Sequence, residues 1–121
     1  NMQFKPFTED IAEEYRKASI FVLSSRFEGW GLTLVEAMSQ HCACVACDYK
    51  GRQAEIIENG KNGLLCRTDD ARELAAKIEA LISDDGLRER LQEASVADLD
   101  RFSEKEVARN MERIILKACR R

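Results

Sequence analysis

Residues 19–48 read SIFVLSSRFEGWGLTLVEAMSQHCACVACD. The run 19–23 is short, apolar and rich in β-formers, which is typical of a strand buried on both faces of a parallel sheet. Serines and glycines in 24–31 indicate a loop, and apolar side chains recur at helical spacing in 32–40. The run 42–47 predicts a second strand. Strand, loop, helix and strand in this order indicate a right-handed βαβ unit and therefore a parallel sheet.

The flanking residues extend the same alternation. A helix is expected at 9–18, with Thr8 as its N-cap, because apolar side chains recur there at helical spacing. After the second strand, which ends at Asp48, we expect a short helix at 54–58 and a third strand at 64–66. The packing residues of the first helix are Ile11, Tyr15 and Ala18, and those of the helix at 32–40 are Leu34, Val35 and Met38.

The last third of the chain is predicted to be helical. Asp69 or Asp70 caps a helix that ends near residue 83, and a second helix covers 86–98. The pattern Ser103-x-x-Glu106 is a capping box at the start of a third helix. The side chains expected to face inward are Leu74, Ile78, Leu81 and Ile82, then Leu87, Leu91 and Ala94, then Val107, Met111, Ile114 and Ile115.

The predicted fold class is α/β, a partial Rossmann-like doubly wound parallel sheet with C-terminal helices. Three strands make a thin sheet, because doubly wound domains usually have about five or six. We therefore expect residues 1–121 to be a single domain whose sheet lacks its first half. At 121 residues, 45% hydrophobic and 34% charged, the composition is that of an ordinary globular domain.

Charge and targeting features exclude several function classes. The net charge of −3 is too small to indicate a nucleic-acid partner. No apolar run approaches the roughly 20 residues that span a bilayer, and residues 1–4 do not resemble an export signal. Five cysteines, an odd number, favour reduced thiols. We expect a cytoplasmic protein, with the inner face of the membrane as an additional location.

The final segment is basic, unlike the rest of the chain. Residues 101–121 carry a net charge of +4, against −7 for the remainder. Cations near the C-terminus of a solvated helix are favoured by the helix dipole, which is one explanation. The other is a docking surface for a further domain or for anionic lipid headgroups.

Cys42, Cys44 and Cys47 raise the question of a metal site. Side chains alternate along a strand, so Cys47 points away from the other two. Three ligands cannot converge from opposite faces, and free cysteine behaves as a small hydrophobe. We interpret all three as core thiols.

The loop 24–31 is the strongest candidate binding site. Ligands of open parallel sheets bind beyond the carboxyl ends of the strands, and this loop leads directly into a helix. Free backbone N–H groups and the positive end of the helix dipole suit a phosphate or a diphosphate. Gly29 and Gly31 lack a Cβ, which allows close backbone approach or a positive φ.

Two carboxylates flank this loop, Glu28 before the glycines and Glu36 in the second turn of the helix. Carboxylates accept hydrogen bonds from vicinal diols, so a ribose on one side and a hexose on the other would explain both. Two structural alternatives remain open. Glu36 could complete a capping box with Thr33, and Glu28 could be a solvated loop acid.

The stretch 19–40 resembles retaining glycosyltransferases of the GT-B architecture, above all family 4 with its Glu–seven residues–Glu motif. Here the motif is Glu28-GWGLTLV-Glu36, and the likeness extends over about 11–82. The resemblance implies transfer of a hexosyl group, with retention, from a nucleoside diphosphate sugar to a glycan, lipid or other acceptor. It implies no cofactor and no metal.

The same resemblance assigns roles to single residues. Glu28 would be the catalytic residue and contact hydroxyls of the donor sugar, and Glu36 would contact the ribose. Donor binding would also involve the backbone of the glycine turn and of the helix start. Those residues are Gly29, Gly31, Leu32 and Thr33.

The chain departs from the family pattern in several places. His41 and Ala43 stand where a glycine and a proline are usual, and residues 49–53 replace a glycine-rich stretch. Lys50 or Arg52 could reach a diphosphate or could be solvated loop cations. No Arg and Lys pair that contacts the diphosphate in the family, and no acceptor domain, is found in the sequence. We expect a donor-binding piece that is inactive alone, with helix 103–121 packing on a missing N-terminal domain.

Three alternatives stay open at this point. Gly29-x-Gly31 after a strand, with Asp48 ending the next strand, is also the pattern of a dehydrogenase that binds NAD, although Leu34 replaces the third glycine. The fold could instead serve as a non-enzymatic interaction domain. A third option is another GT-B enzyme, such as a sugar-nucleotide epimerase.

Overall fold

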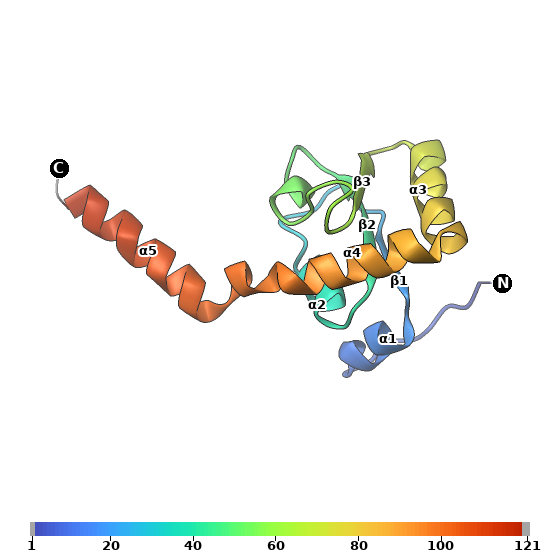
Figure 1. Ribbon diagram of the computed structural model, residues 1–121, viewed down its shortest axis with the longest axis horizontal. Coiled ribbons are helices and arrows are strands. Elements are labelled where there is room, and N and C mark those ends of the chain that lie inside the picture. Colours follow the sequence, from blue (N-terminus) through green and yellow to red (C-terminus); the bar gives the residue numbers. More distant parts are fainter. Residues whose placement is uncertain (1, 120–121) are drawn as a thin grey trace.

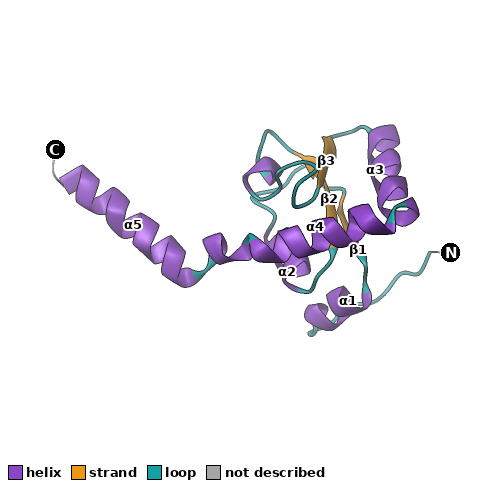
Figure 2. Ribbon diagram, viewed as in Figure 1, coloured by secondary structure: helices purple, strands orange, loops and turns teal. Residues whose placement is uncertain are grey.

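The computed structural model describes residues 2–119 and has a three-stranded parallel sheet at its centre (Figure 2). The strands are β1 (Ile20–Leu23), β2 (Ala43–Asp48) and β3 (Leu64–Arg67), in the order β1-β2-β3. All neighbours run parallel, and the register aligns Val45 with Val22 on one side and with Leu64 on the other. The predicted α/β class and the three predicted strands are confirmed.

Helices pack on both faces of the sheet (Figure 1). The helix α2 connects β1 to β2, and α3 and α4 follow β3. The bounds are α1 (Ile11–Lys17), α2 (Leu32–Ser39), the 3-10 helix η1 (Gln53–Glu55), α3 (Ala71–Ser83), α4 (Asp85–Ala97), the 3-10 helix η2 (Leu99–Phe102) and α5 (Glu104–Cys119). In Figure 1, α4 crosses in front of the sheet and α5 leads away from the body.

Alternate side chains of β2 enter two separate cores, as the pleat of a strand requires. Cys42, just before the strand, and Cys44 pack with α1 and α2, and their core includes buried Tyr15. Val45 packs on the opposite face, against Leu81 of α3 and Leu91 of α4. Because β2 is central and covered on both faces, it is the best-buried strand of the sheet.

The cysteines take the places expected of core thiols. Cys42, Cys44, Cys47 and Cys66 are all buried and free. The Sγ atoms of Cys47 and Cys66 lie 3.5 Å apart, since these residues face each other across β2 and β3. Burial raises the pKa of the Cys66 thiol to about 12, which keeps it protonated and unreactive.

Some helix starts differ from the prediction. Asp70 caps α3 as expected, but α1 is capped by Asp10, whose Oδ1 accepts from the Glu13 N–H at 3.0 Å. Thr8 lies outside the helix and accepts from the Asp10 N–H instead. The short helix predicted at 54–58 is the 3-10 helix η1, and η2 was not predicted.

The expectation that β1 is buried on both faces is wrong for the described chain. All four residues of β1 are only half-buried, because β1 is an edge strand and nothing in residues 2–119 pairs with its free side. Its apolar composition is that of a central strand. Its free N–H and C=O groups can accept a further strand.

The prediction that α5 buries an apolar face is also wrong for the described chain. Ser103 caps the helix as expected, accepting from the Glu106 N–H at 3.3 Å. Yet no residue of α5 is buried by the part of the chain that the structure describes. Ile82 of α3 is likewise exposed, because Leu81 takes the inward position at that turn. The exposed fractions on α5 are 45% for Val107, 58% for Met111, 63% for Ile114 and 56% for Ile115.

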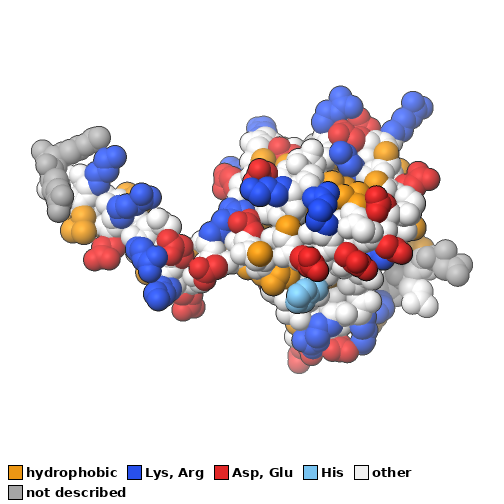
Figure 3. All heavy atoms as spheres, in the orientation of Figure 1, with side chains coloured by type: hydrophobic (Ala, Val, Ile, Leu, Met, Phe, Trp, Pro, Cys, Tyr) orange, Lys and Arg blue, Asp and Glu red, His pale blue; other side chains and the backbone are white. Residues whose placement is uncertain are grey.

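The protruding α5 carries Lys and Arg side chains along its length (Figure 3). Arg120 and Arg121 of the predicted basic helix, as well as Asn1, lie outside the described residues. No helix within residues 2–119 is both long and apolar enough to cross a membrane.

Candidate functional site

Three loops meet at the carboxyl edge of the sheet, where ligands of parallel sheets bind. They comprise residues 24–31 after β1, 49–52 after β2 and 68–70 after β3. The rings of Phe27 and Tyr49 contact each other edge to face, with centroids 5.2 Å apart. Arg26 Nε lies 2.6 Å from Asp69 Oδ1. These contacts join the loop after β1 to the other two.

Gly31 forms the turn that starts α2. Its φ of +99° is left-handed, and it is the N-cap of the helix. A Cβ at this position would lie 3.2 Å from Leu34 Cδ1 and 3.6 Å from Leu23 Cδ2. Because both the backbone conformation and the packing exclude a side chain, glycine is required here.

The N-terminus of α2 is open. No described side chain caps it, and Leu32 and Thr33 at the first two helical positions are exposed. The first N–H groups of a helix have no intrahelical partner and carry the positive end of its dipole. The geometry predicted for an anion site is present at this end of α2.

Glu28 lies in the loop just before this turn and is half-buried. Its Oε1 accepts from the Gly29 N–H at 3.0 Å, so the carboxylate lies beside the glycine turn. Only one oxygen is used in this contact. The other remains able to accept from a ligand hydroxyl.

Glu36 lies one turn into α2 and faces α1. Its Oε2 is 3.5 Å from the Tyr15 hydroxyl, at the outer limit of a hydrogen bond. Burial, and secondarily the nearby Glu36 charge, raises the pKa of Tyr15. The capping-box alternative is wrong: Gly31 is the N-cap, so Thr33 is already inside the helix.

Residues 49–53, which follow β2, contact the loop that contains the glycine turn at 29–31. Asp48 Oδ1 accepts from the backbone N–H groups of Gln53 and Ala54 at 3.1 and 3.2 Å, so it caps η1. Arg52 Nη1 donates to the Gly29 carbonyl at 2.9 Å. Lys50 is exposed and lies over the Tyr49 ring. Of the two loop cations, Arg52 therefore contacts the site and Lys50 does not.

His41 lies at the opposite end of α2 from the glycine turn. It is exposed, and its φ of +62° is left-handed. This histidine, which stands where a glycine is usual in the family pattern, has a backbone conformation that glycine adopts without strain. A role of His41 at the anion site is excluded by its distance along the helix, about 12 Å for eight residues.

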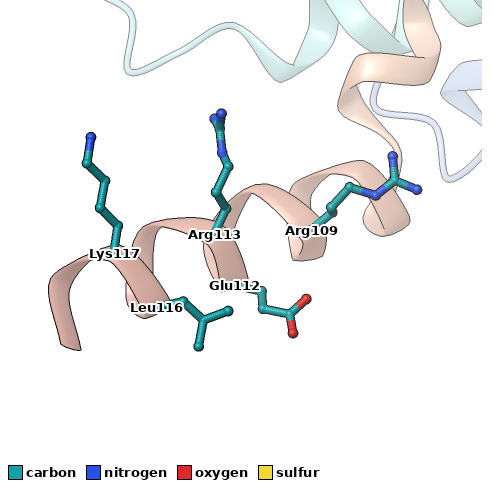
Figure 4. A pocket seen from close by; sticks show the side chains of 5 residues that line it. All are labelled: Arg109, Glu112, Arg113, Leu116 and Lys117. Atoms are coloured by element: carbon teal, nitrogen blue, oxygen red, sulfur yellow. The ribbon is translucent and has the colours of Figure 1, made fainter. Parts of the chain in front are cut away.

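Two of the hollows in the described chain lie outside the α2 turn. One, of about 210 Å³, lies between the loop after β1, the end of β2 and the start of α3 and is lined by Ser24, Arg26, Cys47, Asp69, Asp70, Ala71 and Leu74. The other is a groove on α5, where Arg113 and Lys117 project to one side and Leu116 and Glu112 to the other (Figure 4). Neither hollow is lined by any of the six donor-site residues predicted from the sequence, which all lie within 28–36.

Two residues of this site were missed by sequence reasoning. Tyr15 was expected in the core but not beside Glu36, and Gln53 was not singled out at all. A buried glutamine at the start of a 3-10 helix has no periodicity or motif that would reveal it. Both contacts join segments that are far apart in the sequence.

Comparison with known proteins gives the family. The profile described as glycosyl transferases group 1 matches residues 1–97. The chain belongs to this family. The dehydrogenase alternative has no support, and the Asp48 carboxylate that it needs for a ribose is instead bonded to two backbone N–H groups of η1.

Similar glycosyl transferases of group 1 are known in bacteria. An alpha-1,3-N-acetylgalactosaminyltransferase of Campylobacter jejuni that acts on N,N'-diacetylbacillosaminyl-diphospho-undecaprenol is 34% identical over 99 residues, which are 82% of this chain and 26% of that protein. Other matching relatives are named as glucosyl-, mannosyl- and N-acetylglucosaminyltransferases. The chain spans 15% to 28% of the length of the curated relatives it matches.

Solved group 1 structures share the fold. The C-terminal domain of the protein LpcC from Francisella tularensis superimposes with a TM-score of 0.71 at 32% identity, over 88% of this chain and 53% of that one. A mutant of TarM from Staphylococcus aureus, solved with fondaparinux, alpha-GlcNAc-glycerol and UDP, gives 0.80 at 25% identity, over 88% and 22%. The described sheet corresponds to the C-terminal domain of GT-B glycosyltransferases.

Proposed function

We propose that this chain forms part of the donor site of a retaining glycosyltransferase that transfers a hexosyl group from a nucleoside diphosphate sugar. The observation that carries the proposal is the open N-terminus of α2 behind the left-handed Gly31, at the carboxyl edge of the sheet. The TarM complex supports the ligand class, since that relative was solved with UDP.

In this proposal the diphosphate lies on the backbone of Gly31, Leu32 and Thr33. The N–H groups of Leu32 and Thr33, in the first turn of α2, have no intrahelical partner and are available to negative charge. Charge grows on the diphosphate as the sugar leaves, so fixed donors stabilise the transition state more than the ground state. This charge stabilisation comes from the backbone, and we propose that transfer requires neither a metal nor a cofactor.

Glu28 is proposed to accept from hydroxyls of the donor sugar. Its carboxylate lies beside the glycine turn and has one oxygen free of the Gly29 contact. Glu36 is proposed to accept from the ribose hydroxyls, one turn further along α2. The Tyr15 hydroxyl beside Glu36 supports this role, because it limits the rotamers that the carboxylate can adopt.

Retention is supported by the names of several relatives, which specify alpha linkages. An α-linked product made from an α-linked nucleotide sugar has kept its anomeric configuration. The same names differ in the sugar transferred, so we propose a hexose or N-acetylhexosamine as the class.

We propose that turnover needs a further, acceptor-binding domain, and that the chain alone is inactive. In the described chain, α5 leaves its apolar face uncovered and β1 leaves one edge unpaired. Packing of α5 on the acceptor domain would cover this face, while its cations could assist peripheral contact with an anionic membrane. A cytoplasmic enzyme at the inner face of the membrane fits this arrangement.

An NMR titration of labelled chain tests the donor site. UDP, GDP, ADP and NAD are added in parallel, and backbone amide shifts are followed. Shifts at residues 29–36 with one diphosphate are expected and would identify the base. Shifts with NAD alone, or with none of the four, would contradict the proposal.

Two variants test the carboxylates. Glu36→Ala should weaken binding of the nucleoside diphosphate about tenfold, the value of a hydrogen bond to a charged group. Glu28→Ala should leave nucleoside diphosphate binding unchanged and weaken only the intact nucleotide sugar. Equal losses for both ligands in Glu28→Ala would remove its assignment to the hexose.

A further inference from the structure

The side chain of Gln53 occupies an unusual position between β2 and the glycine turn. It is fully buried, at the first position of η1. Its Oε1 accepts from the Tyr49 backbone N–H at 2.7 Å. Since an N–H group can only donate, the oxygen must face Tyr49 and the nitrogen must face the other way.

The Nε2 group of Gln53 has no hydrogen-bond partner within residues 2–119. Buried polar groups are nearly always paired, and an unpaired one destabilises the fold. Burying an apolar side chain of the same length would avoid this penalty. The unpaired donor therefore needs an explanation.

The unpaired donor is directed at the start of α2. A Cβ built on Gly31 would lie 3.7 Å from Nε2, so the amide packs against the N-cap of the helix. Arg52, the residue before Gln53, donates a hydrogen bond to the Gly29 carbonyl of the same turn. Gly29 itself is exposed, with open space where a Cβ would be. Gly29 is therefore free to adjust, whereas Trp30 packs on the Phe102 ring and Gly31 is buried beside Leu34.

We infer that Gln53 is a binding residue of the donor site, whose Nε2 donates to a phosphate oxygen of the nucleoside diphosphate held at the N-terminus of α2. The inference rests on the proposed function. In this inference, a small adjustment at the unpacked Gly29 on phosphate binding brings an oxygen within reach of the amide. The donor that is unpaired in the free chain thereby gains an anionic acceptor, which is its strongest kind of partner.

The decisive variant is Gln53→Glu. It keeps the oxygen that accepts from Tyr49 and replaces only the unpaired NH2 group. Ionised, the new carboxylate would repel a phosphate; protonated, it could again donate. A buried carboxyl titrates above its ordinary range, so this change falls within an accessible pH interval.

The measurement is the dissociation constant of inorganic pyrophosphate, from the amide shifts of Leu32 and Thr33, at several pH values between 5.5 and 8. Because pyrophosphate itself titrates in this range, the result is expressed as a ratio at each pH. It is the dissociation constant of the variant divided by that of the unaltered chain. We expect a ratio of about ten or more at pH 8 that falls as the pH is lowered. Gln53→Met, which has neither donor nor charge, should give a smaller ratio that does not change with pH.

Gln40→Glu is the matched control. It adds the same charge at the C-cap of α2 and should leave pyrophosphate binding unchanged. A ratio near one for Gln53→Glu at every pH, in a chain that binds pyrophosphate, would overturn the role of Gln53 and leave the donor site standing. A pH-independent ratio shared equally by both Gln53 variants would assign it a purely structural role. Failure of the unaltered chain to bind pyrophosphate or any nucleoside diphosphate would overturn both proposals.

Discussion

Replacing Gly31 by alanine tests the structural basis of the anion site. Gly31 is the left-handed N-cap of α2, and the open helix end depends on its conformation. An L-residue in the left-handed region costs about 1–2 kcal/mol relative to glycine. Alanine also reduces the entropy of the unfolded chain, which returns about 0.4–1 kcal/mol. The backbone alone should therefore reduce the free energy of unfolding by roughly 1 kcal/mol.

Packing adds to this loss. The new Cβ would lie 3.2 Å from Leu34 Cδ1, closer than ordinary contact, and Leu34 is fully buried. Leu34 belongs to α2, so any adjustment of its side chain is transmitted to the helix start. An overpacked core site costs about 1–3 kcal/mol, and one methyl group against one side chain belongs at the lower end. We expect Gly31→Ala to lose about 2 kcal/mol in total.

Gly29→Ala is the control within the same loop. Its Cβ would have no neighbour within 4 Å, and its φ is outside the left-handed region. Alanine there should be neutral or stabilising by a few tenths of a kcal/mol. Urea denaturation followed by circular dichroism measures both variants, with the slope checked for constancy. Equal stabilities of the two variants would refute the assignment of Gly31 as a required glycine.

Two further predictions concern other parts of the fold. His41→Gly should raise the free energy of unfolding by about 0.5–1 kcal/mol, because His41 has a left-handed φ that glycine adopts without strain, and an unchanged urea midpoint would contradict this. Glu73 accepts from the backbone N–H of Arg67 and from its Nε, and the backbone bond foremost lowers the pKa of this carboxyl. A carboxyl with a lowered pKa stabilises the fold at pH values above its ordinary pKa of 4.5. This contribution to stability is lost as the pH falls through the lowered pKa. Glu73→Gln should therefore be less stable than the unaltered chain at pH 7, with the difference shrinking towards pH 3; a difference that persists at pH 3 would argue against the ionised carboxylate as its cause.

The strands and α2 could be predicted because their signals are local. Residues 19–23 and 42–47 are apolar runs with polar ends, and the turn before Leu32 contains the glycine that its backbone requires. Loop, glycine and helix occur within ten residues. The predicted position of the anion site depends only on this short stretch and on the rule that ligands bind at the carboxyl edge.

The prediction of burial is wrong for two elements that residues 2–119 do not fully cover. The apolar stripe of α5 is a sound amphipathic pattern, yet every residue on it is exposed, and β1 is half-buried despite a composition typical of a central strand. A periodic pattern states which face of an element is apolar. It does not state what covers that face.

The clearest failure of sequence reasoning lies in residues 49–53, which replace a glycine-rich stretch. A glycine-rich loop approaches a ligand through its backbone, whereas this segment positions the neighbouring loop with three side chains. Tyr49 packs on Phe27, Arg52 holds the Gly29 carbonyl, and Gln53 lies against Gly31. The departure from the family pattern therefore leaves the proposed site with side-chain contacts from this segment. Side chains of the segment after β2 contact the loop that contains the glycine turn. Substitutions of Tyr49, Arg52 or Gln53 should therefore change donor affinity, although these residues form no motif in the sequence.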